Sequence, residues 1–465
     1  MRWRVAVTAT LLNMLVCLLL LSVCAYSAGY TTGYGVNMAN STANPIEKLS
    51  PQMRAKGFAH FQNSGTGAIG QYYNYAVVTP YYGEKAADYG MWNEYAAPGY
   101  YAVTLDETDI RCEMTVSPYA ACHRYSFGAA GGRIAVDFEN DGLYETSSGW
   151  LRGKAIDPAV RVQDAKTLLA AVTLQGVRLS FVLYFEGDGS LSEDGIYRQA
   201  APGTVTVWVS VSAVGESEAL AESEKARSIP FDTARADALN AWDVALSAIE
   251  IGDDEVKKGE KEIFYSDLYH TLVKPNDWNG GSWLWSDGAL VVDFSTLWDM
   301  YKTQLPLVLT LYPTVSEHIV ETWQKLGETA GHFPNAFMIS NRMGICRDQA
   351  QMLTEYGLYD AWKRGVQADW QKIYDVILRD IDSEDFRAFE ETGKGVCSSH
   401  TLDMAGGCAL LAEMAEKLGT PAEAERFRRL AENWKNVFDL STGLLLNEGK
   451  YYEGNYWTYS FRPIA

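Results

Sequence analysis

The glutamate at position 453 lies in the stretch KYYEGNYWTYSFRPIA, where glycine and asparagine follow it directly. Its aromatic neighbours Tyr451, Tyr452, Tyr456 and Trp457 can exclude water from the carboxyl group. Because desolvation disfavours the charged form, such a carboxyl can keep its proton near neutral pH and deliver it to a leaving group. The bare pattern is also typical of an exposed loop glutamate, so the stretch alone leaves both interpretations open.

A second acidic candidate follows a tryptophan in the stretch TLWDMY. The indole of Trp298 offers a flat face for stacking on a sugar ring, and Asp299 can accept hydrogen bonds from hydroxyl groups. Thr296 and Asp299 also stand three residues apart at a predicted helix start, which is close to a capping arrangement that needs no ligand.

Three further polar residues lie in segments flanked by Gly or Pro, namely His60 in GFAHFQNSGTG and Asn93 with Glu94 in WNEYAAPGYY. Loops carry binding residues disproportionately often, although a lone His is more often a satisfied structural residue. The stretch DWNGGSWLW adds three tryptophans that either wall a pocket or pack their own loop: Trp278, Trp283 and Trp285.

Length and charge restrict the classes of partner. A chain of 465 residues exceeds what one hydrophobic core usually fills, so we expect two domains. Lys and Arg total 39 against 59 Asp and Glu, and the resulting net charge of −20 repels nucleic acid and anionic lipid. No CxxC or HxxxH spacing suggests zinc.

Residues 1–28 have the pattern of a secretory signal peptide. Arg2 and Arg4 precede the uncharged run VAVTATLLNMLVCLLLLSVCAYSA, which is also long enough to serve as an uncleaved signal anchor. We therefore expect a secreted or extracytoplasmic protein, free or anchored to the membrane at its N-terminus. In an oxidising compartment, Cys112 and Cys122 in consecutive predicted strands either form a cross-strand disulfide or remain two buried thiols.

The periodicity of the chain changes near residue 215. Short β-rich runs such as YYAVTLD, IRCEMTV and TVTVWVSVSA precede it and alternate apolar with polar residues, which predicts an antiparallel β-sandwich over 29–214. Residues 215–253 follow as a helical linker. Helical patterns then run through 254–465, at about 255–273, 296–311, 315–327, 347–357, 360–379, 401–418 and 421–438.

The linker includes FDTARADALNAWDVALSAIE, in which helical spacing aligns Leu239, Trp242, Leu246 and Ile249. These four residues predict the buried face of a helix that Asp232 caps.

Several segments, in order along the chain, resemble glycoside hydrolase family 92, the calcium-dependent α-mannosidases. They span nearly the whole chain after residue 28: GFAHFQNSGTG (57–67), NEYAAPGYYAVTL (93–105), CHRYSF (122–127), FYSDLYHTLVKPNDW (264–278), DFSTLWDMYKTQLPLVLTLYP (293–313), SSHTLDMAGGCALLAEMAEKLG (398–419) and EGNYWTYSF (453–461). The resemblance implies a β-sandwich packed on an (α/α)6 barrel, with 254–465 as the N-terminal part of the barrel. The chain departs from the family at Thr458, where we expect an amide, and in MISNRMGICRDQAQML, which differs from the glycine- and histidine-containing segment that the resemblance implies.

The resemblance also implies roles for the candidates above. Glu453 would be the general acid, and Ca²⁺ would assist by holding two sugar hydroxyls, although no ligand residue is assigned. The implied substrate contacts are Trp298, Asp299, His60, Asn93, Glu94 and Trp457. The implied activity is an inverting exo-α-mannosidase, with α-1,2 preference, acting on a mannose-containing glycan or glycoprotein. The alternatives are a non-catalytic carbohydrate-binding protein and an α-glucoside hydrolase or phosphorylase of similar architecture.

Inversion needs a second carboxylate, about 6.5–9.5 Å from the acid, to activate the attacking water. The family resemblance places that base in a later GNDD-like segment, and only Arg462 is charged after Glu453. About eight helical segments are predicted here, against twelve in a closed (α/α)6 barrel. We therefore expect a C-terminally truncated chain that does not hydrolyse mannosides efficiently as given.

Overall fold

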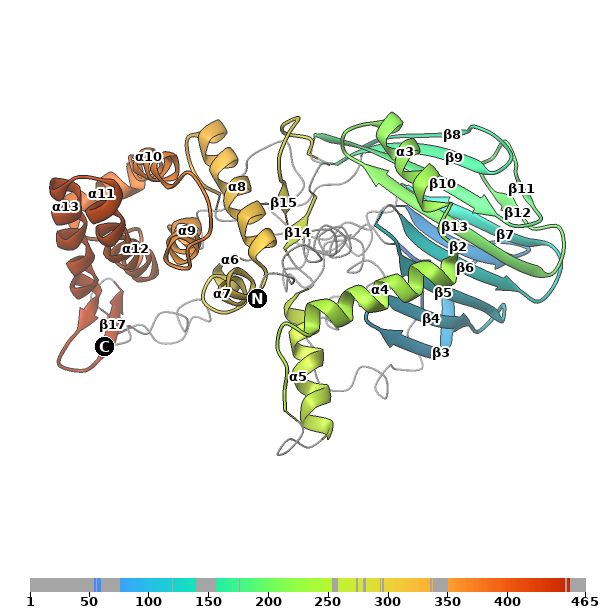
Figure 1. Ribbon diagram of the computed structural model, residues 1–465, viewed down its shortest axis with the longest axis horizontal. Helices are drawn as coiled ribbons and strands as arrows, with labels where there is room; N and C mark the ends of the chain where they lie inside the picture. Colours follow the sequence, from blue (N-terminus) through green and yellow to red (C-terminus); the bar gives the residue numbers. More distant parts are fainter. Residues whose placement is uncertain are drawn as a thin grey trace, which may run out of the picture. The chain divides into compact units, whose positions relative to one another are not determined.

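The computed structural model describes residues 54–55, 57–59, 76–118, 120–138, 156–174, 176–252, 258–272, 275–278, 282–292, 294, 297–334, 337, 350–447 and 450–451. The chain forms two compact units. The first, Met1–Gly288 with Ile339–Arg342, is called the sandwich unit, and the second, Ala289–Met338 with Met343–Ala465, is called the helical unit. The expected multidomain β-plus-α class, a β-sandwich followed by helices, is confirmed (Figure 1).

The sandwich unit contains two antiparallel sheets. The larger has nine strands in the order β1-β3-β4-β5-β6-β13-β10-β9-β8, and the smaller has the order β11-β12-β7-β2. The strand bounds are β1 Arg54–Ala55, β2 Val77–Tyr82, β3 Tyr89–Ala97, β4 Tyr100–Leu105, β5 Ile110–Val116, β6 Ala121–Phe127, β7 Gly132–Asp137, β8 Ile156–Val162, β9 Thr167–Leu174, β10 Val177–Glu186, β11 Ser190–Leu191, β12 Tyr197–Arg198 and β13 Gly203–Ser212.

The two cysteines of β5 and β6 are free and buried. Cys112 pairs in register with Tyr125, whereas Cys122 pairs with Thr115. Cys112 and Thr115 are three residues apart on one strand, so the two thiols point to opposite faces of the sheet. The disulfide alternative is therefore wrong, and the alternative of two buried thiols is confirmed.

Two helices, α3 Glu216–Ala226 and α4 Phe231–Leu246, cover the face of the large sheet that carries Trp208 (Figure 1). Helices α3 and α4, which lie within the segment 215–253 expected as a linker, thus pack on the sandwich. The predicted face of α4 is wrong at Leu239, which is 48% exposed. The buried residues of α4 are Phe231, Ala234, Ala238, Trp242 and Ala245.

The reason for this difference is the small size of alanine. A Cβ added at Gly99 would lie only 2.9 Å from the Cβ of Ala238, so the helix approaches the sheet more closely than a leucine face allows. Asp232 is likewise no cap, because α4 begins at Phe231 and Asp232 instead accepts a hydrogen bond from Arg124 at 2.8 Å.

The helical unit consists of helices of different lengths, and several of them begin or end at residues typical of helix caps. Their bounds are α6 Leu297–Met300, α7 Gln304–Leu311, α8 Pro313–Ala330, α9 Leu353–Lys363, α10 Trp370–Asp380, α11 Glu384–Thr392, α12 Ser398–Leu418 and α13 Pro421–Ala431. Left-handed glycines follow α8 and α11, at Gly331 and Gly393. Thr420 and Glu423 form a capping box at the start of α13.

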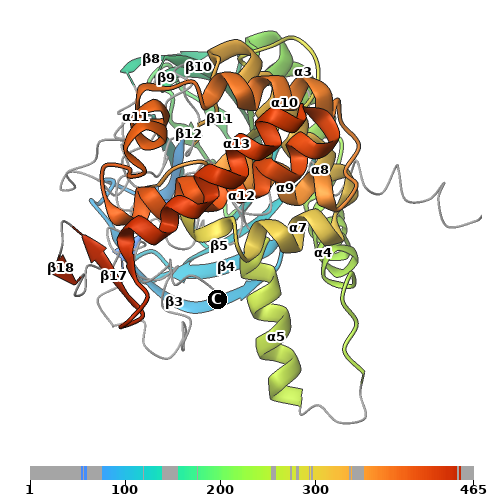
Figure 2. The ribbon, with the colours of Figure 1, turned by 90° about the vertical axis from the view of Figure 1, so that its left-hand side faces the viewer.

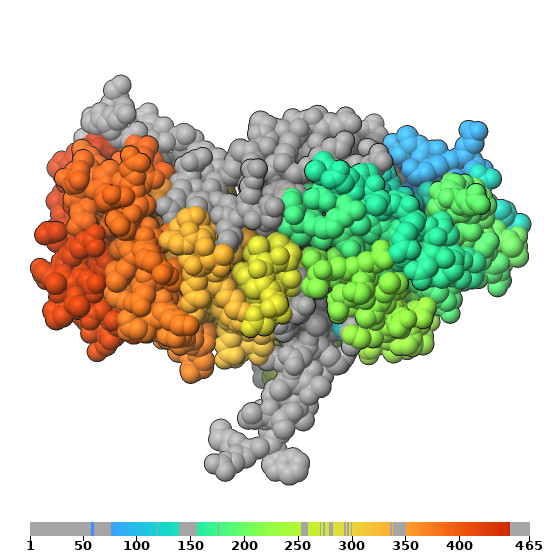
Figure 3. All heavy atoms as spheres, turned by 90° about the horizontal axis from the view of Figure 1, so that it is seen from above, coloured from blue at the N-terminus to red at the C-terminus, as the bar shows by residue number. Residues whose placement is uncertain are grey.

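The predicted segment 296–311 forms α6 and α7, whereas 347–357 and 360–379 are displaced to α9 and α10. The left-handed Gly365 lies between these two helices, just after the end of α9. Helices α12 and α13 pack against each other and lie side by side in Figure 2. In Figure 3, the residues of α8 and the later helices are coloured from orange to red.

The remaining described elements are one helix and several short segments. They are α5 Lys258–Thr271, β14 Asn276–Asp277, β15 Val291–Val292, a 3-10 helix at Glu432–Val437, β16 Phe438–Asp439, β17 Leu444–Asn447 and β18 Lys450–Tyr451. Within the described ranges, no helix is long and apolar enough to cross a membrane. The segment 1–28 lies outside those ranges.

Candidate functional site

The predicted site residues Asn93 and Glu94 form a β-bulge in β3. The register between β3 and β4 shifts between Trp92 and Tyr95, and Asn93 adopts a left-handed φ of 49°. Asparagine tolerates this conformation better than most residues do. The Asn93 side chain is exposed. The backbone carbonyl oxygen of Asn93 accepts a hydrogen bond from Nη1 of Arg111 at 2.6 Å.

Glu94 lies partly buried on the same bulge. The hydroxyl of Tyr101 donates a hydrogen bond to its Oε1 at 2.5 Å, and Tyr101 itself is fully buried. Oε2 of Glu94 is buried and has no hydrogen-bond partner among the described residues. Desolvation by burial raises the pKa of the Glu94 carboxyl, although the Tyr101 hydrogen bond opposes the shift. Glu94 therefore supports the bulge, and a substrate contact for it stays a prediction.

Helix α6 carries the candidates of the helical unit. Leu297 and Met300 are buried at 0% and 2% exposure, whereas Trp298 is only partly buried. Two buried residues three apart fix the inner face of this single turn, so Trp298 is turned away from that face. Asp299 belongs to α6, but its side chain lies outside the described part of the structure, so the capping and sugar-binding interpretations both stay predictions.

A buried acid that the sequence analysis did not single out lies on α12. Asp403 is 1% exposed, and its Oδ2 accepts a hydrogen bond from the backbone N–H of Gln351 at 3.0 Å. Its Oδ1 is buried without a hydrogen-bond partner in the described part of the chain. Burial raises the pKa of Asp403 to about 8, while the Gln351 N–H and the charge of Lys302 act in the opposite direction. Asp403 is therefore protonated in the folded protein at neutral pH.

Two tyrosines connect Asp403 to the end of α6. The hydroxyl of Tyr356 donates to the backbone oxygen of Asp403 at 3.1 Å, and its ring meets that of Tyr301 edge to face at 5.3 Å between centroids. Tyr301 immediately follows α6. Burial, and then the charge of Asp403, raise the pKa of Tyr301 and of Tyr356. This arrangement connects α12, through Tyr356 of α9, to the end of the helix that carries Trp298.

Close approach of Tyr356 to α12 depends on a glycine. A Cβ added at Gly406 would lie 2.0 Å from the Tyr356 hydroxyl oxygen, which no real structure accommodates without movement. The adjacent cavity, lined in part by Gln351, Met352 and Met404, has a volume of about 20 Å³. That is room for roughly one water molecule and not for a sugar ring.

The signal for Asp403 was present in the sequence. Met404, Cys408, Leu411 and Ala415 repeat at helical spacing, and such an apolar stripe in a helix predicts a buried face. An acid directly beside this stripe indicates a buried carboxyl, which needs a specific partner or a proton.

Several predicted residues lie outside the described part: Glu453, Trp457 and His60. Among the described tryptophans, Trp278 and Trp283 meet edge to face at 5.5 Å, so at least these two pack their own loop. Among the described residues, no group of three or more His, Cys, Asp and Glu side chains could hold a metal ion. The described residues therefore assign no ligand to calcium, and we derive no step through it.

Comparison with known protein families decides the classification. The glycosyl hydrolase family 92 N-terminal domain model matches residues 37–215, and the family 92 catalytic domain model matches residues 216–464. The chain belongs to glycosyl hydrolase family 92. The resemblance noted in the sequence is thereby confirmed.

Individual relatives of this family 92 chain are distant. A curated relative, an uncharacterized secreted glycosidase from Arthroderma benhamiae, is 21% identical, and the match covers 82% of this chain and 56% of the relative. A family 92 α-mannosidase structure from Bacteroides thetaiotaomicron has a TM-score of 0.72 at 17% identity, covering 87% of this chain and 63% of that one.

A family 92 inverting mannosidase from the same organism has a TM-score of 0.69 at 19% identity, covering 86% of this chain and 60% of that one. At these identities the structural likeness shows the fold. The chain spans less than two thirds of the length of each of these three relatives.

Proposed function

We propose that this family 92 chain belongs to a secreted exo-α-mannosidase that removes terminal α-linked mannose from glycans. The main observation that supports this proposal is that the two family models together match residues 37–464. The α-mannosidase and inverting mannosidase among the structural relatives, and the secreted glycosidase among the curated ones, support the substrate class, the inversion and the export. The α-1,2 preference rests on the family resemblance.

In this proposal, Glu453 is the general acid that protonates the leaving oxygen of the glycosidic bond. Trp298 stacks on the terminal mannose, and Asp299 accepts hydrogen bonds from its hydroxyls. His60, Asn93, Glu94 and Trp457 are proposed as further substrate contacts. The sequence after Glu453 contains no Asp or Glu, so we assign no general base after that residue.

Calcium is the proposed cofactor, because the resemblance is to a calcium-dependent family. When bound, the ion would coordinate sugar hydroxyls and help to distort the ring. The described residues assign no ligand to it.

The decisive experiment separates recognition from hydrolysis. Purified protein is mixed with an α-1,2-linked mannobioside, and both binding and release of mannose are measured. Specific binding that Trp298→Ala abolishes supports the proposed terminal-mannose contact. Any mannose release should disappear in Glu453→Gln, which removes the transferable proton while preserving shape. Binding of glucosides in preference to mannosides, or release that Glu453→Gln leaves unchanged, would overturn this assignment.

A further inference from the structure

Two exposed aromatic side chains lie together on the sandwich unit. Among the strongly exposed large hydrophobic residues of the described chain, the aromatic ones are Trp92, at 51% exposure, and Tyr95, at 52%. Both belong to β3, three residues apart. Large aromatic rings are normally buried, so a neighbouring pair left half-exposed on one strand indicates a surface that contacts a ligand.

The bulge in β3 places both rings on one face of the sheet. Residues three apart on a regular strand point to opposite faces. Here Trp92 pairs with Thr104 and Tyr95 with Ala102, because the register shifts between them. Thr104 and Ala102 are two residues apart and share a face, so Trp92 and Tyr95 share it as well. The bulge at Asn93 thus aligns two rings that a regular strand would separate.

The backbone that carries the two rings is held in place. Arg111 fixes the carbonyl of Asn93, and Tyr101 fixes the carboxylate of Glu94, as described above. The ring of Tyr95 also lies 5.9 Å from that of Tyr100, whose own face is covered by the guanidinium of Arg235 at 3.7 Å. Because all of these contacts are made within the chain itself, binding would cost little ordering of the bulge.

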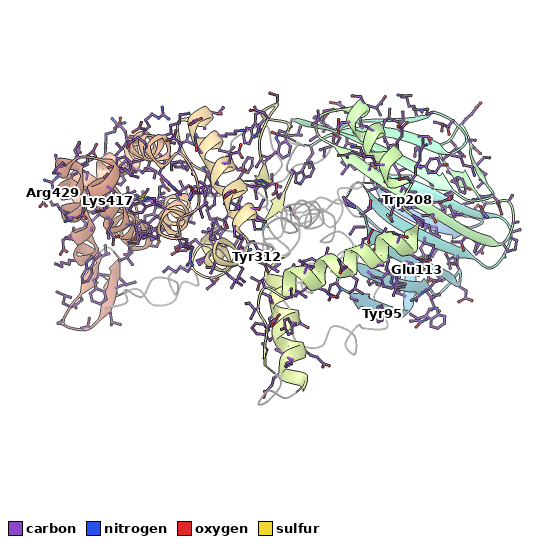
Figure 4. All side chains as sticks on the ribbon, viewed as in Figure 1. Tyr95, Glu113, Trp208, Tyr312, Lys417 and Arg429 are labelled. Carbon is purple, nitrogen blue, oxygen red and sulfur yellow. The ribbon has the colours of Figure 1, made fainter. Side chains whose placement is uncertain are left out.

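The cations beside the rings are engaged by neighbouring groups. Arg124 donates to Glu113 at 2.8 Å and to Asp232 at 2.8 Å, and Arg111 lies between these groups and the bulge. Figure 4 marks Tyr95 and Glu113 on the sheet, with Trp208 further across it beneath the helices. The guanidinium of Arg111 is engaged by the Asn93 carbonyl, and that of Arg235 by the Tyr100 ring. With Arg124 held by its two carboxylates, these three cations are not free to select a phosphate or an acidic sugar. Flat rings bordered by fixed hydrogen-bonding groups suit a neutral ligand that has one apolar face and several hydroxyls.

We propose that Trp92 and Tyr95 form a stacking platform for the sugar rings of a neutral glycan. The proposal rests on the proposed function, since it extends glycan contact to a defined surface of the sandwich unit. It adds that the ligand is an oligosaccharide or polysaccharide, because two separate rings can engage more than one sugar residue.

The test measures binding of the full chain to soluble polysaccharides by affinity electrophoresis, using α-mannan, the neutral glucan dextran and the acidic polymer polygalacturonate. The wild-type chain should be retarded by α-mannan, and the double variant Trp92→Ala/Tyr95→Ala should weaken that binding by about tenfold or more. The double variant Trp92→Phe/Tyr95→Phe should retain most of the binding, because the rings remain. Unchanged circular dichroism and melting would show that the alanine variant is folded.

The matched control is Ile156→Ala/Val160→Ala, since these side chains are 54% and 51% exposed on β8 of the same sheet. This control should bind like the wild type. Mannan binding that survives the aromatic-to-alanine change but is lost in Trp298→Ala would overturn the platform and leave the proposed function intact. Platform-dependent binding of dextran alone would support the platform and contradict the mannosidase. Platform-dependent binding of polygalacturonate, or retardation by none of the polymers, would overturn the proposal for a neutral glycan.

Discussion

Replacing Asp403 with asparagine should change the pH dependence of stability in the helical unit. The carboxyl has a pKa of about 8 in the folded protein, against an ordinary value of 3.8. The folded state therefore binds the proton more tightly than the unfolded state does. The stability from this group is complete below about pH 4 and is lost progressively as the pH rises through about 8.

The size of the effect follows from the shift. Each pKa unit corresponds to about 1.36 kcal/mol, so raising the pH from about 4.5 to about 7.5 should cost the wild type roughly 4 kcal/mol through this residue. Asparagine resembles the protonated acid in shape, and its Oδ1 can still accept the Gln351 N–H. The difference in stability between Asp403→Asn and the wild type should thus grow by about 4 kcal/mol in favour of the variant over that range.

Hydrogen exchange of the α12 amides, corrected for the intrinsic effect of pH, measures this difference within the helical unit. The control is Glu222→Gln in α3, because burial raises the pKa of that carboxyl to about 7 but in the sandwich unit. This control should leave α12 exchange unchanged. If the gap between Asp403→Asn and the wild type is the same at both pH values, Asp403 is already charged in the folded protein and our account of its burial is wrong.

Three other predictions concern local contacts and the proposed cofactor. Glu94→Ala should destabilise the sandwich unit by about 1–2 kcal/mol, because it removes the hydrogen bond from the buried Tyr101, whereas Glu94→Gln should cost less; equal urea midpoints for the two variants would contradict this. Gly406→Ala should lower the free energy of unfolding by about 1–3 kcal/mol, because the added Cβ displaces the Tyr356 hydroxyl. The control Gly259→Ala, where a Cβ meets no atom within 4 Å, should not lower the melting temperature. Thorough chelation should weaken mannoside binding by the complete enzyme, and Ca²⁺ should restore it; calorimetry that shows the same affinity with and without chelator would count against calcium.

Periodicity and short motifs in the sequence predicted individual strands and helices, and the family of this protein. Alternation in runs such as 203–212 predicts a strand, since side-chain direction reverses at every residue, and β13 forms there. The helical pattern at 296–311 predicted that Trp298 lies on a helix, and α6 forms there. The ordered family segments predicted membership of family 92, which the family models confirm. These conclusions depend on neighbours in sequence, so the sequence alone sufficed for them.

Features that depend on partners distant in sequence were decided by the tertiary structure. The buried face of α4 passes through Ala234, Ala238 and Ala245 and not through Leu239, because the helix approaches the sheet closely at Gly99. The opposite directions of Cys112 and Cys122 follow from strand register, which no spacing between the two cysteines reveals.

The same holds for the two features that carry chemistry. A one-residue shift in pairing brings Trp92 and Tyr95 to one face, although their spacing predicts opposite faces. The apolar stripe beside Asp403 indicates only that the residue lies near a buried face, and its proton is retained because the packed helical unit removes water from its carboxyl. The desolvation of a carboxyl group depends on all the atoms that surround it, so it arises only once the chain has folded.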